Sequence, residues 1–130
     1  MLAFCKGQKV MVNYLERSRG IVEEQIISMK SDFFKALAHP TRVAILERLG
    51  NEQVCVCHII EDLGLEQSNV SQHLAILRKQ NIITSTKVGL QVHYRIKYPE
   101  VLGILKTVEG ILTQQLQDSH ALIKHLSGQE

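Results

Sequence analysis

Apolar residues recur at helical spacing near both ends of the chain. In residues 10–29 the apolar positions are spaced as on one face of a helix: Val10, Tyr14, Leu15, Ile21, Val22 and Ile26. The same spacing returns after Pro99 and continues to Leu126, over roughly seven helical turns. We therefore expect a first helix that follows a flexible tail of residues 1–9, and a long last helix over residues 99–127.

Two shorter helices are predicted between residues 31 and 50. Ser31 and Asp32 can cap a short helix that ends at Leu37. Pro40 suits the first position of the next helix, because a helix leaves that N–H without a partner in any case. Gly50 is typical of the residue that follows the last helical turn.

The central segment has the pattern of a helix-turn-helix and a hairpin. Residues 54–63 and 67–80 are predicted to form two helices joined at Gly64, and a short turn with glycine between such helices is the helix-turn-helix spacing. Residues 82–97 then change to strand-forming types on both sides of Gly89, which predicts a β-hairpin. A hairpin directly after the second helix is a wing.

These elements predict a mainly α-helical fold with a β-hairpin wing, a winged helix-turn-helix. A chain of 130 residues suits one domain with a modest core. We expect that domain to span residues 10–130, with the helix-turn-helix at 54–80, the wing at 82–97 and the last helix at 99–127. That helix is longer and more apolar than a small core needs. We therefore expect a homodimer formed through the C-terminal helix with help from the N-terminal helix, and packing within the monomer is the alternative.

The composition is that of a globular protein without a membrane segment. The hydrophobic fraction is 45%, and no apolar run approaches the roughly 18 residues of a membrane span. The N-terminus lacks the charged-then-apolar pattern of a secretory signal, so we expect a cytoplasmic protein with no membrane partner. Three cysteines cannot all pair within the chain, and free thiols in a reducing compartment are either inert core or groups that bind and react.

Positive charge is concentrated in one part of the sequence. Residues 67–97 hold five basic residues and no Asp or Glu, so the rest of the chain carries a net −3 within a total of +2. A basic stripe on a mildly acidic chain favours a polyanionic partner, and a solvated basic face is the alternative.

Short polar side chains crowd the first turns of the helix predicted at residues 67–80. A recognition helix presents such groups to base edges in the major groove. The predicted base-contacting residues are Gln67, Ser68, Asn69, Ser71, Gln72 and His73. Phosphate contacts are predicted for basic residues of this helix and the wing: Arg78, Lys79, Lys87, Arg95 and Lys97. The sequence thus predicts double-stranded operator DNA as the partner, with a winged-helix module that binds protein as the competing hypothesis.

Three segments occur in order along the chain: Ala36 to Arg42, Cys55-Val56-Cys57, and Gln67 to Arg78. Together they resemble the ArsR/SmtB family of metal-sensing repressors, over roughly residues 32–105. The resemblance implies a homodimeric winged helix-turn-helix repressor that releases its operator when an effector binds.

Cys55 and Cys57 are candidate ligands of a soft ion. In mid-helix, residues two apart point about 200° apart, but beside a helix start the backbone is partly extended and both side chains can share a face. A helix N-terminus also favours the thiolate, which selects soft ions such as As(III), Cd(II), Pb(II) or Zn(II). Binding across both thiolates would pull the helix start out of regular geometry. Burial of both cysteines as small hydrophobic residues is the alternative.

The family pattern suggests how the site is completed. In the family Cys-Val-Cys is followed by Asp-Leu and often by a third cysteine, but here His58, Ile59 and Ile60 follow. Some members bring a cysteine from the N-terminal tail, often of the other subunit, which makes Cys5 the candidate third ligand. Three sulfurs suit pyramidal As(III) or Sb(III), the favoured effectors. The alternatives are Cd(II), Pb(II) or Zn(II), and thiol oxidation or persulfide chemistry between Cys5 and the pair.

Other candidate chemistry is weaker. A second family metal site on the last helix is half matched by Asp118-Ser119-His120, but His125 has the wrong spacing, so we predict a polar face there. His39 is predicted to cap a helix and His93 to lie on the wing surface. No nucleophile–base pair or phosphate loop occurs, so we expect neither an enzyme nor an organic cofactor.

Overall fold

The structure is a computed structural model that describes the backbone of residues 2–128 and the side chains of residues 10–128. The chain divides into two compact units, residues 1–38 and residues 39–130. The first unit is the helix α1, and the second holds all the other helices and strands.

Helix α1 runs from Leu2 to Leu37 without interruption. It therefore includes residues 2–9, where a tail was expected, and it joins the two helices predicted before residue 38. Ser31 and Asp32 continue the helix rather than capping a new one, because no Pro or Gly interrupts residues 21–37. Gly20 is accommodated at a cost of about 1 kcal/mol relative to alanine. Many of the large apolar side chains of α1 are exposed, among them Val10, Tyr14, Leu15, Ile27 and Met29.

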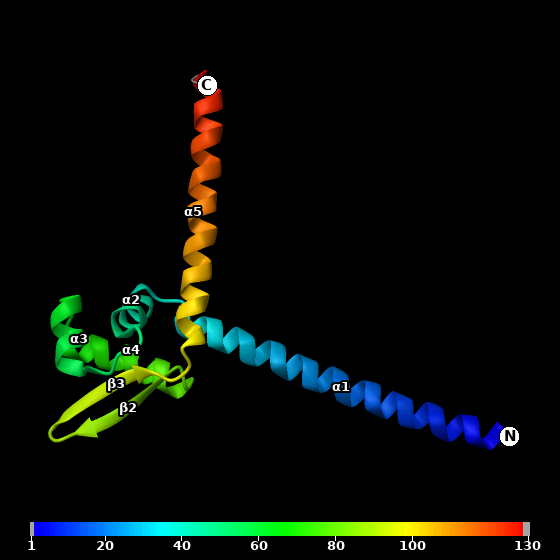
Figure 1. Cartoon of the computed structure of the whole chain (residues 1–130). Coiled ribbons are helices and arrows are strands. Elements are labelled where there is room, and N and C mark those ends of the chain that lie inside the picture. The colour runs from blue at the N-terminus through cyan, green and yellow to red at the C-terminus, as the bar shows by residue number, and fades with distance from the viewer. Residues whose placement is uncertain (1, 129–130) are drawn as a thin grey trace. The chain divides into compact units, whose positions relative to one another are not determined.

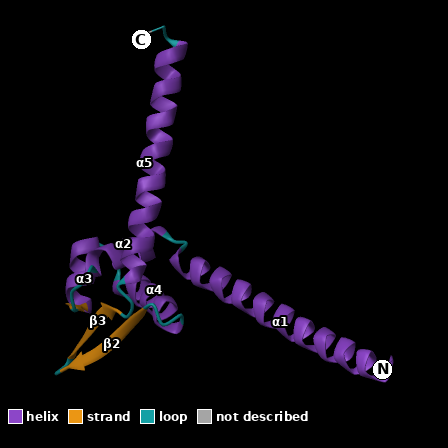
Figure 2. Ribbon diagram, turned by 45° about the vertical axis from the view of Figure 1, so that its right-hand side comes forward, coloured by secondary structure: helices purple, strands orange, loops and turns teal. Residues whose placement is uncertain are grey.

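The second unit confirms the predicted winged helix-turn-helix. Its elements, in order, are α2 (Pro40–Leu49), β1 (Val54–Cys55), α3 (Val56–Leu63), α4 (Gln67–Lys79), β2 (Ile83–Val88), β3 (Gln91–Ile96) and α5 (Glu100–Leu126). The three short helices pack together, with α2 next to α5, and the β2–β3 hairpin extends away from them (Figures 1 and 2).

The predicted helix signals act as expected. Pro40 is the first residue of α2, and the Nδ1 atom of His39 accepts a hydrogen bond of 3.1 Å from the Thr41 N–H, so His39 caps the helix. Gly64 follows α3 with φ 62° and ψ 31°, a left-handed conformation that glycine adopts without a Cβ penalty. This turn sets the direction in which α4 leaves α3.

The sheet has three antiparallel strands in the order β1–β3–β2. The wing hairpin was predicted, but β1 was not, because two residues are too short to show an alternating pattern. β1 pairs Val54 with Tyr94 and Cys55 with His93. The segment before α3 is therefore hydrogen-bonded to the wing.

One core holds the helices of the second unit against the sheet. Its most buried side chains, each at most 1% exposed, come from the helices of the unit and from the start of β2: Ile45, Leu46, Leu49, Ile59, Val70, Leu74, Leu77, Ile82, Ile83 and Val101. Burial of a side chain of this size contributes about 1.5–3 kcal/mol. The inward orientation of Val70, Leu74 and Leu77 is as predicted, and it leaves the polar face of α4 outside.

Only the beginning of α5 belongs to this core. Val101 is buried and Ile104 and Leu105 are half-buried, whereas every described residue from Lys106 onward is exposed. The exposed part still carries large apolar side chains: Val108, Ile111, Leu112, Leu116, Leu122, Ile123 and Leu126. None of the helices in the described residues is long and apolar enough to span a membrane.

Candidate DNA interface and thiol site

The outer face of α4 carries most of the predicted base-contacting residues. Their side chains are exposed at the start of the helix: Gln67, Ser68, Asn69, Ser71 and Gln72. They include amide and hydroxyl groups that donate and accept hydrogen bonds, which suits base edges in a major groove. The structure thus leaves these groups accessible on a helix that the core holds from its other side.

The predicted phosphate-contacting residues are also exposed. Arg78 and Lys79 lie in the last turn of α4, Lys87 lies on β2 and Arg95 lies on β3. Lys97 follows β3, with its Nζ atom 5.4 Å from the centre of the Tyr98 ring. These charges come from the helix and the wing of one unit, which is the distribution that winged-helix proteins use for the DNA backbone.

His73 differs from its neighbours on α4, because its side chain is half-buried and engaged. Arg42 of α2 places Nη1 3.1 Å from His73 Nδ1, and the His39 and His73 rings lie with centroids 4.2 Å apart, tilted by 35°. Burial lowers the pKa of His73, and the charges of His39 and Arg42 lower that pKa further.

Cys55 and Cys57 lie on either side of the start of α3. Cys55 is the residue before the helix, with φ −63° and ψ 141°, and Cys57 is in its first turn. The backbone of Cys55 is thus extended, as is usual directly before a helix start. Cys55 is only 3% exposed, whereas Cys57 is exposed.

The two thiols affect each other's ionisation. Hydrogen bonding with Cys57 lowers the pKa of Cys55 and, as its counterpart, raises the pKa of Cys57. Backbone hydrogen bonds from the first turn of α3, at Cys57 and His58, lower the pKa of Cys55 further against the effect of burial. Cys55 is thus the thiol of the pair that ionises first as the pH rises.

Cys55 is also joined to the wing. Its Sγ atom donates a hydrogen bond of 3.6 Å to Oε1 of Gln91 on β3, and its Cα is paired with that of His93. Directly paired residues of an antiparallel ladder project from the same face of the sheet. His93 was predicted as a wing surface residue, and the structure places it on the wing with its side chain half-buried.

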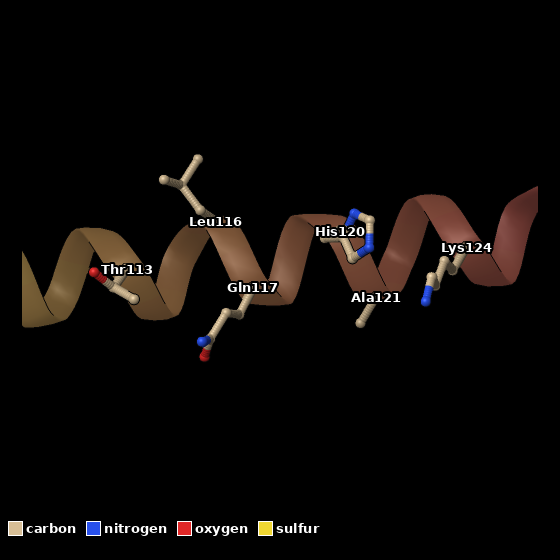
Figure 3. A pocket seen from close by; sticks show the side chains of 6 residues that line it. All are labelled: Thr113, Leu116, Gln117, His120, Ala121 and Lys124. Carbon is tan, nitrogen blue, oxygen red and sulfur yellow. The ribbon is translucent and has the colours of Figure 1, made fainter.

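Among the side chains that the structure describes, the remaining candidate ligands are not brought together. The side chain of Cys5 lies outside the described residues. Among the residues whose side chains the structure describes, no group of three or more His, Cys, Asp or Glu is arranged to hold a metal ion. On α5, Asp118 accepts a hydrogen bond of 2.9 Å from Gln114, and His120 lines a shallow hollow along one face of the helix (Figure 3).

Sequence reasoning missed Gln91 and Arg42. Gln91 lies 36 positions from Cys55, and Arg42 lies 31 positions from His73, so no local pattern relates the members of either pair. Arg42 falls inside the segment that carries the family resemblance but outside the basic stripe of residues 67–97. The strand β1, had it been recognised, would have pointed to Gln91 and His93.

Comparisons with known proteins agree with this architecture. A family model described as bacterial regulatory protein, arsR family, matches residues 39–85. The HTH-type transcriptional regulator Rv0081 of Mycobacterium tuberculosis is 35% identical over 104 residues, which are 79% of this chain and 91% of that protein. Its crystal structure matches with a TM-score of 0.66 over 72% of this chain and 95% of that one.

Two further relatives bear on regulation. A protein of Synechocystis named transcriptional repressor SmtB homolog is 30% identical over 106 residues, which are 78% of this chain and 80% of that protein. The structure of reduced HlyU from Vibrio cholerae is 28% identical, with a TM-score of 0.62 over 68% of this chain and 94% of that chain.

A helix-turn-helix followed by a wing, with polar and basic groups on its outer face, defines a winged helix-turn-helix DNA-binding protein. The relatives from Mycobacterium tuberculosis and Synechocystis are described as a transcriptional regulator and a transcriptional repressor. The chain belongs to the ArsR/SmtB family of bacterial transcriptional regulators, as its sequence motifs indicated.

Proposed function

We propose that this regulator is a homodimeric repressor that releases its operator when a thiophilic ion binds Cys55 and Cys57. The observation that carries the proposal is the placement of Cys55 directly before α3 and of Cys57 in its first turn, inside the helix-turn-helix itself. As(III) or Sb(III) is the favoured effector, because trivalent arsenic takes three sulfur ligands in a pyramid. Cys5 would supply the third sulfur.

The exposed apolar side chains of α5 support the homodimer. From Val108 to Leu126 they extend the stripe that begins at the buried Val101, and they have no partner within the second unit. A stripe of this length in water favours association, and two-fold pairing is the commonest form. A dimer would also present two copies of α4 to a palindromic operator.

Ion binding would change the contacts of both ends of the thiol pair. Coordination replaces the thiol protons, so Cys55 would lose the S–H that it donates to Gln91. The ion would also set the Sγ–Sγ separation of Cys55 and Cys57, which fixes the backbone at the start of α3. Both changes act on the helix-turn-helix and on the wing through β1, and release of DNA follows from altered positions of α4 and the hairpin.

The test is fluorescence anisotropy of the reduced protein on its own promoter DNA, titrated with arsenite. Release of DNA near one equivalent of arsenite per subunit supports the proposal. If arsenite leaves DNA binding intact, the effector is instead Cd(II), Pb(II) or Zn(II), and each is titrated in turn. Cys57→Ser should keep operator binding and lose the response. Cys5→Ser should lose it only if the third sulfur is Cys5, and loss of folding in Cys57→Ser would favour a buried structural role.

A second candidate function is a thiol-redox or persulfide-responsive repressor on the same scaffold. The lowered pKa of Cys55 supports it, since the thiolate is the form that oxidants attack. A related structure is described as the reduced form of HlyU. Hydrogen peroxide would take two electrons and two protons from two thiols, leaving a disulfide and water. Release by peroxide, reversal by a dithiol and no affinity for arsenite would favour this function.

A further inference from the structure

The contacts of His73 point to a use other than base contact. Arginine has only donors, so the Nη1 of Arg42 lying 3.1 Å from Nδ1 requires that nitrogen to be the unprotonated acceptor. His39 is fixed in the same way, because its Nδ1 accepts from the Thr41 N–H. Both Nδ1 atoms are therefore acceptors, and the two rings lie beside the first turn of α2 with centroids 4.2 Å apart and a tilt of 35°.

The His73 ring, which lies against that of His39, holds the Arg42 guanidinium at the side of helix α4. His73 lies between the buried stripe of α4 and its exposed face, where Asn69 and Ile76 are its neighbours one turn away. Arg42 is half-buried and belongs to the neighbouring helix α2. Phosphates border the major groove on both sides, so a cation at the side of the helix that enters the groove faces the DNA backbone.

We propose that Arg42 contacts a DNA phosphate and that His73 positions it, so that His73 is a positioning residue and not a base-contacting one. A guanidinium stays charged at any relevant pH and matches a phosphate with paired N–H groups. Fixing one of its nitrogens beforehand reduces the rotamer freedom that is lost when DNA binds. The inference depends on DNA binding by the family and is independent of the thiol effector.

Two substitutions of His73 separate the two roles. The Oδ1 atom of asparagine lies near the place of histidine Nδ1, so His73→Asn keeps an acceptor for Arg42. The Oε1 atom of glutamine lies near the place of Nε2, so His73→Gln keeps a polar group for a base but removes the acceptor.

Arg42→Gln removes the charge that is proposed to contact the phosphate. Arg48→Gln is the matched control, since Arg48 lies on the same helix in an ion pair with Asp62 of α3.

The experiment measures anisotropy of each full-length variant on operator and on unrelated duplex DNA over a series of salt concentrations. We expect Arg42→Gln to weaken operator binding roughly tenfold and to flatten the slope of log affinity against log salt by about 0.9. His73→Gln should reproduce that change, His73→Asn should stay near the wild type, and Arg48→Gln should keep the wild-type slope. Combining Arg42→Gln with His73→Gln should add little, because both remove one contact.

Two results would overturn the proposal. One is an unchanged salt slope in a folded Arg42→Gln protein, which means that no phosphate is contacted. The other is a loss of preference for operator over unrelated DNA in His73→Asn but not in His73→Gln, which makes His73 a base-contacting residue. Circular dichroism checks folding, and if Arg42→Gln does not fold, the slope of His73→Gln decides the question.

Discussion

The Sγ atom of Cys55 donates a hydrogen bond of 3.6 Å to Oε1 of Gln91, which joins the buried thiol of the helix-turn-helix to the wing. The paired positions of Cys55 and His93 reinforce this connection through the backbone ladder. A ligand that changes the protonation or position of Cys55 would thus act on the start of α3 and on the wing at once. Ion binding can therefore affect DNA binding through α3 or through the wing, and the two contributions can be tested separately.

Gln91→Leu tests the route to the wing. Leucine has a similar size and no acceptor, so the S–H of Cys55 loses the acceptor on the wing while the ion ligands stay intact. We expect the affinity for arsenite to stay near that of the wild type. The coupling free energy between arsenite and operator binding, typically about 1–3 kcal/mol in allosteric proteins, should fall. Anisotropy titrations with and without arsenite measure that coupling.

Gln91→Glu is the matched control for this variant, since it keeps an acceptor at the same place. It should retain more of the coupling than Gln91→Leu does. Equal coupling in wild type and Gln91→Leu would mean that the signal travels through α3 alone.

The hydrogen bond between the two thiols predicts how they titrate. In a Cys5→Ser background, the thiolate absorbance should rise in two steps, because the pKa of Cys55 is lowered and that of Cys57 is raised. Cys57→Ala removes the donor, and the pKa of Cys55 should then move up toward the ordinary value. Cys57→Ser keeps a hydroxyl donor and should retain part of the lowering. A single step at one pH in the Cys5→Ser protein would show that the thiols are independent.

The salt dependence of operator binding tests the wing charges. Arg95 on β3 is exposed and was predicted to contact phosphate. Arg95→Gln should lower the magnitude of the slope of log affinity against log salt by about 0.9, with a loss of affinity that is similar for operator and unrelated DNA. Lys106→Gln, in the exposed part of α5 outside the basic stripe, is the control. An equal slope in Arg95→Gln and wild type would remove Arg95 from the interface.

The sequence allowed the wing, the helix-turn-helix and the buried face of α4 to be predicted, because each has a local signal. Gly64 marks the turn, Gly89 marks the hairpin, and the 70–74–77 spacing marks the inner face. Family motifs added the identity of the regulator class.

Other features depend on contacts between distant segments, which leave no periodic signal. The two-residue strand β1 forms only because β3 is present to pair with it. His73 looked like a member of a uniform polar face, and only its contacts with Arg42 and His39 distinguish it from Gln72. Side-chain direction and long-range pairing thus set the limit of the sequence prediction.

Leu116→Glu tests the proposed dimer. Leu116 is 72% exposed in the chain by itself, and a carboxylate there would have to be buried against the second copy. Both copies carry the change in a two-fold dimer, so we expect association to weaken on the order of 100-fold. Sedimentation equilibrium measures the change, and operator affinity should fall with it, because two recognition helices are no longer linked.

Gln117→Glu provides the control for charge alone, because Gln117 projects away from Leu116 on the same helix (Figure 3). It should leave association within about twofold of the wild type. Unchanged association in Leu116→Glu would place the interface on another surface, and equal weakening in both variants would point to a general effect of charge on α5.

The lowered pKa of His73 predicts that acid destabilises the folded chain. Burial is the main cause, and the charges of His39 and Arg42 add to it, so the folded state holds His73 neutral. Below the unfolded value of about 6.5 the unfolded chain binds more protons than the folded one, and stability therefore falls as the pH drops toward the lowered pKa of the native state. His73→Asn removes this group and should lose less stability than the wild type over the same interval. Urea unfolding at fixed protein concentration, between about pH 7.5 and about pH 5, measures the difference. If the free energy of unfolding falls equally in the two proteins, the contacts of His73 contribute nothing to the loss of stability in acid.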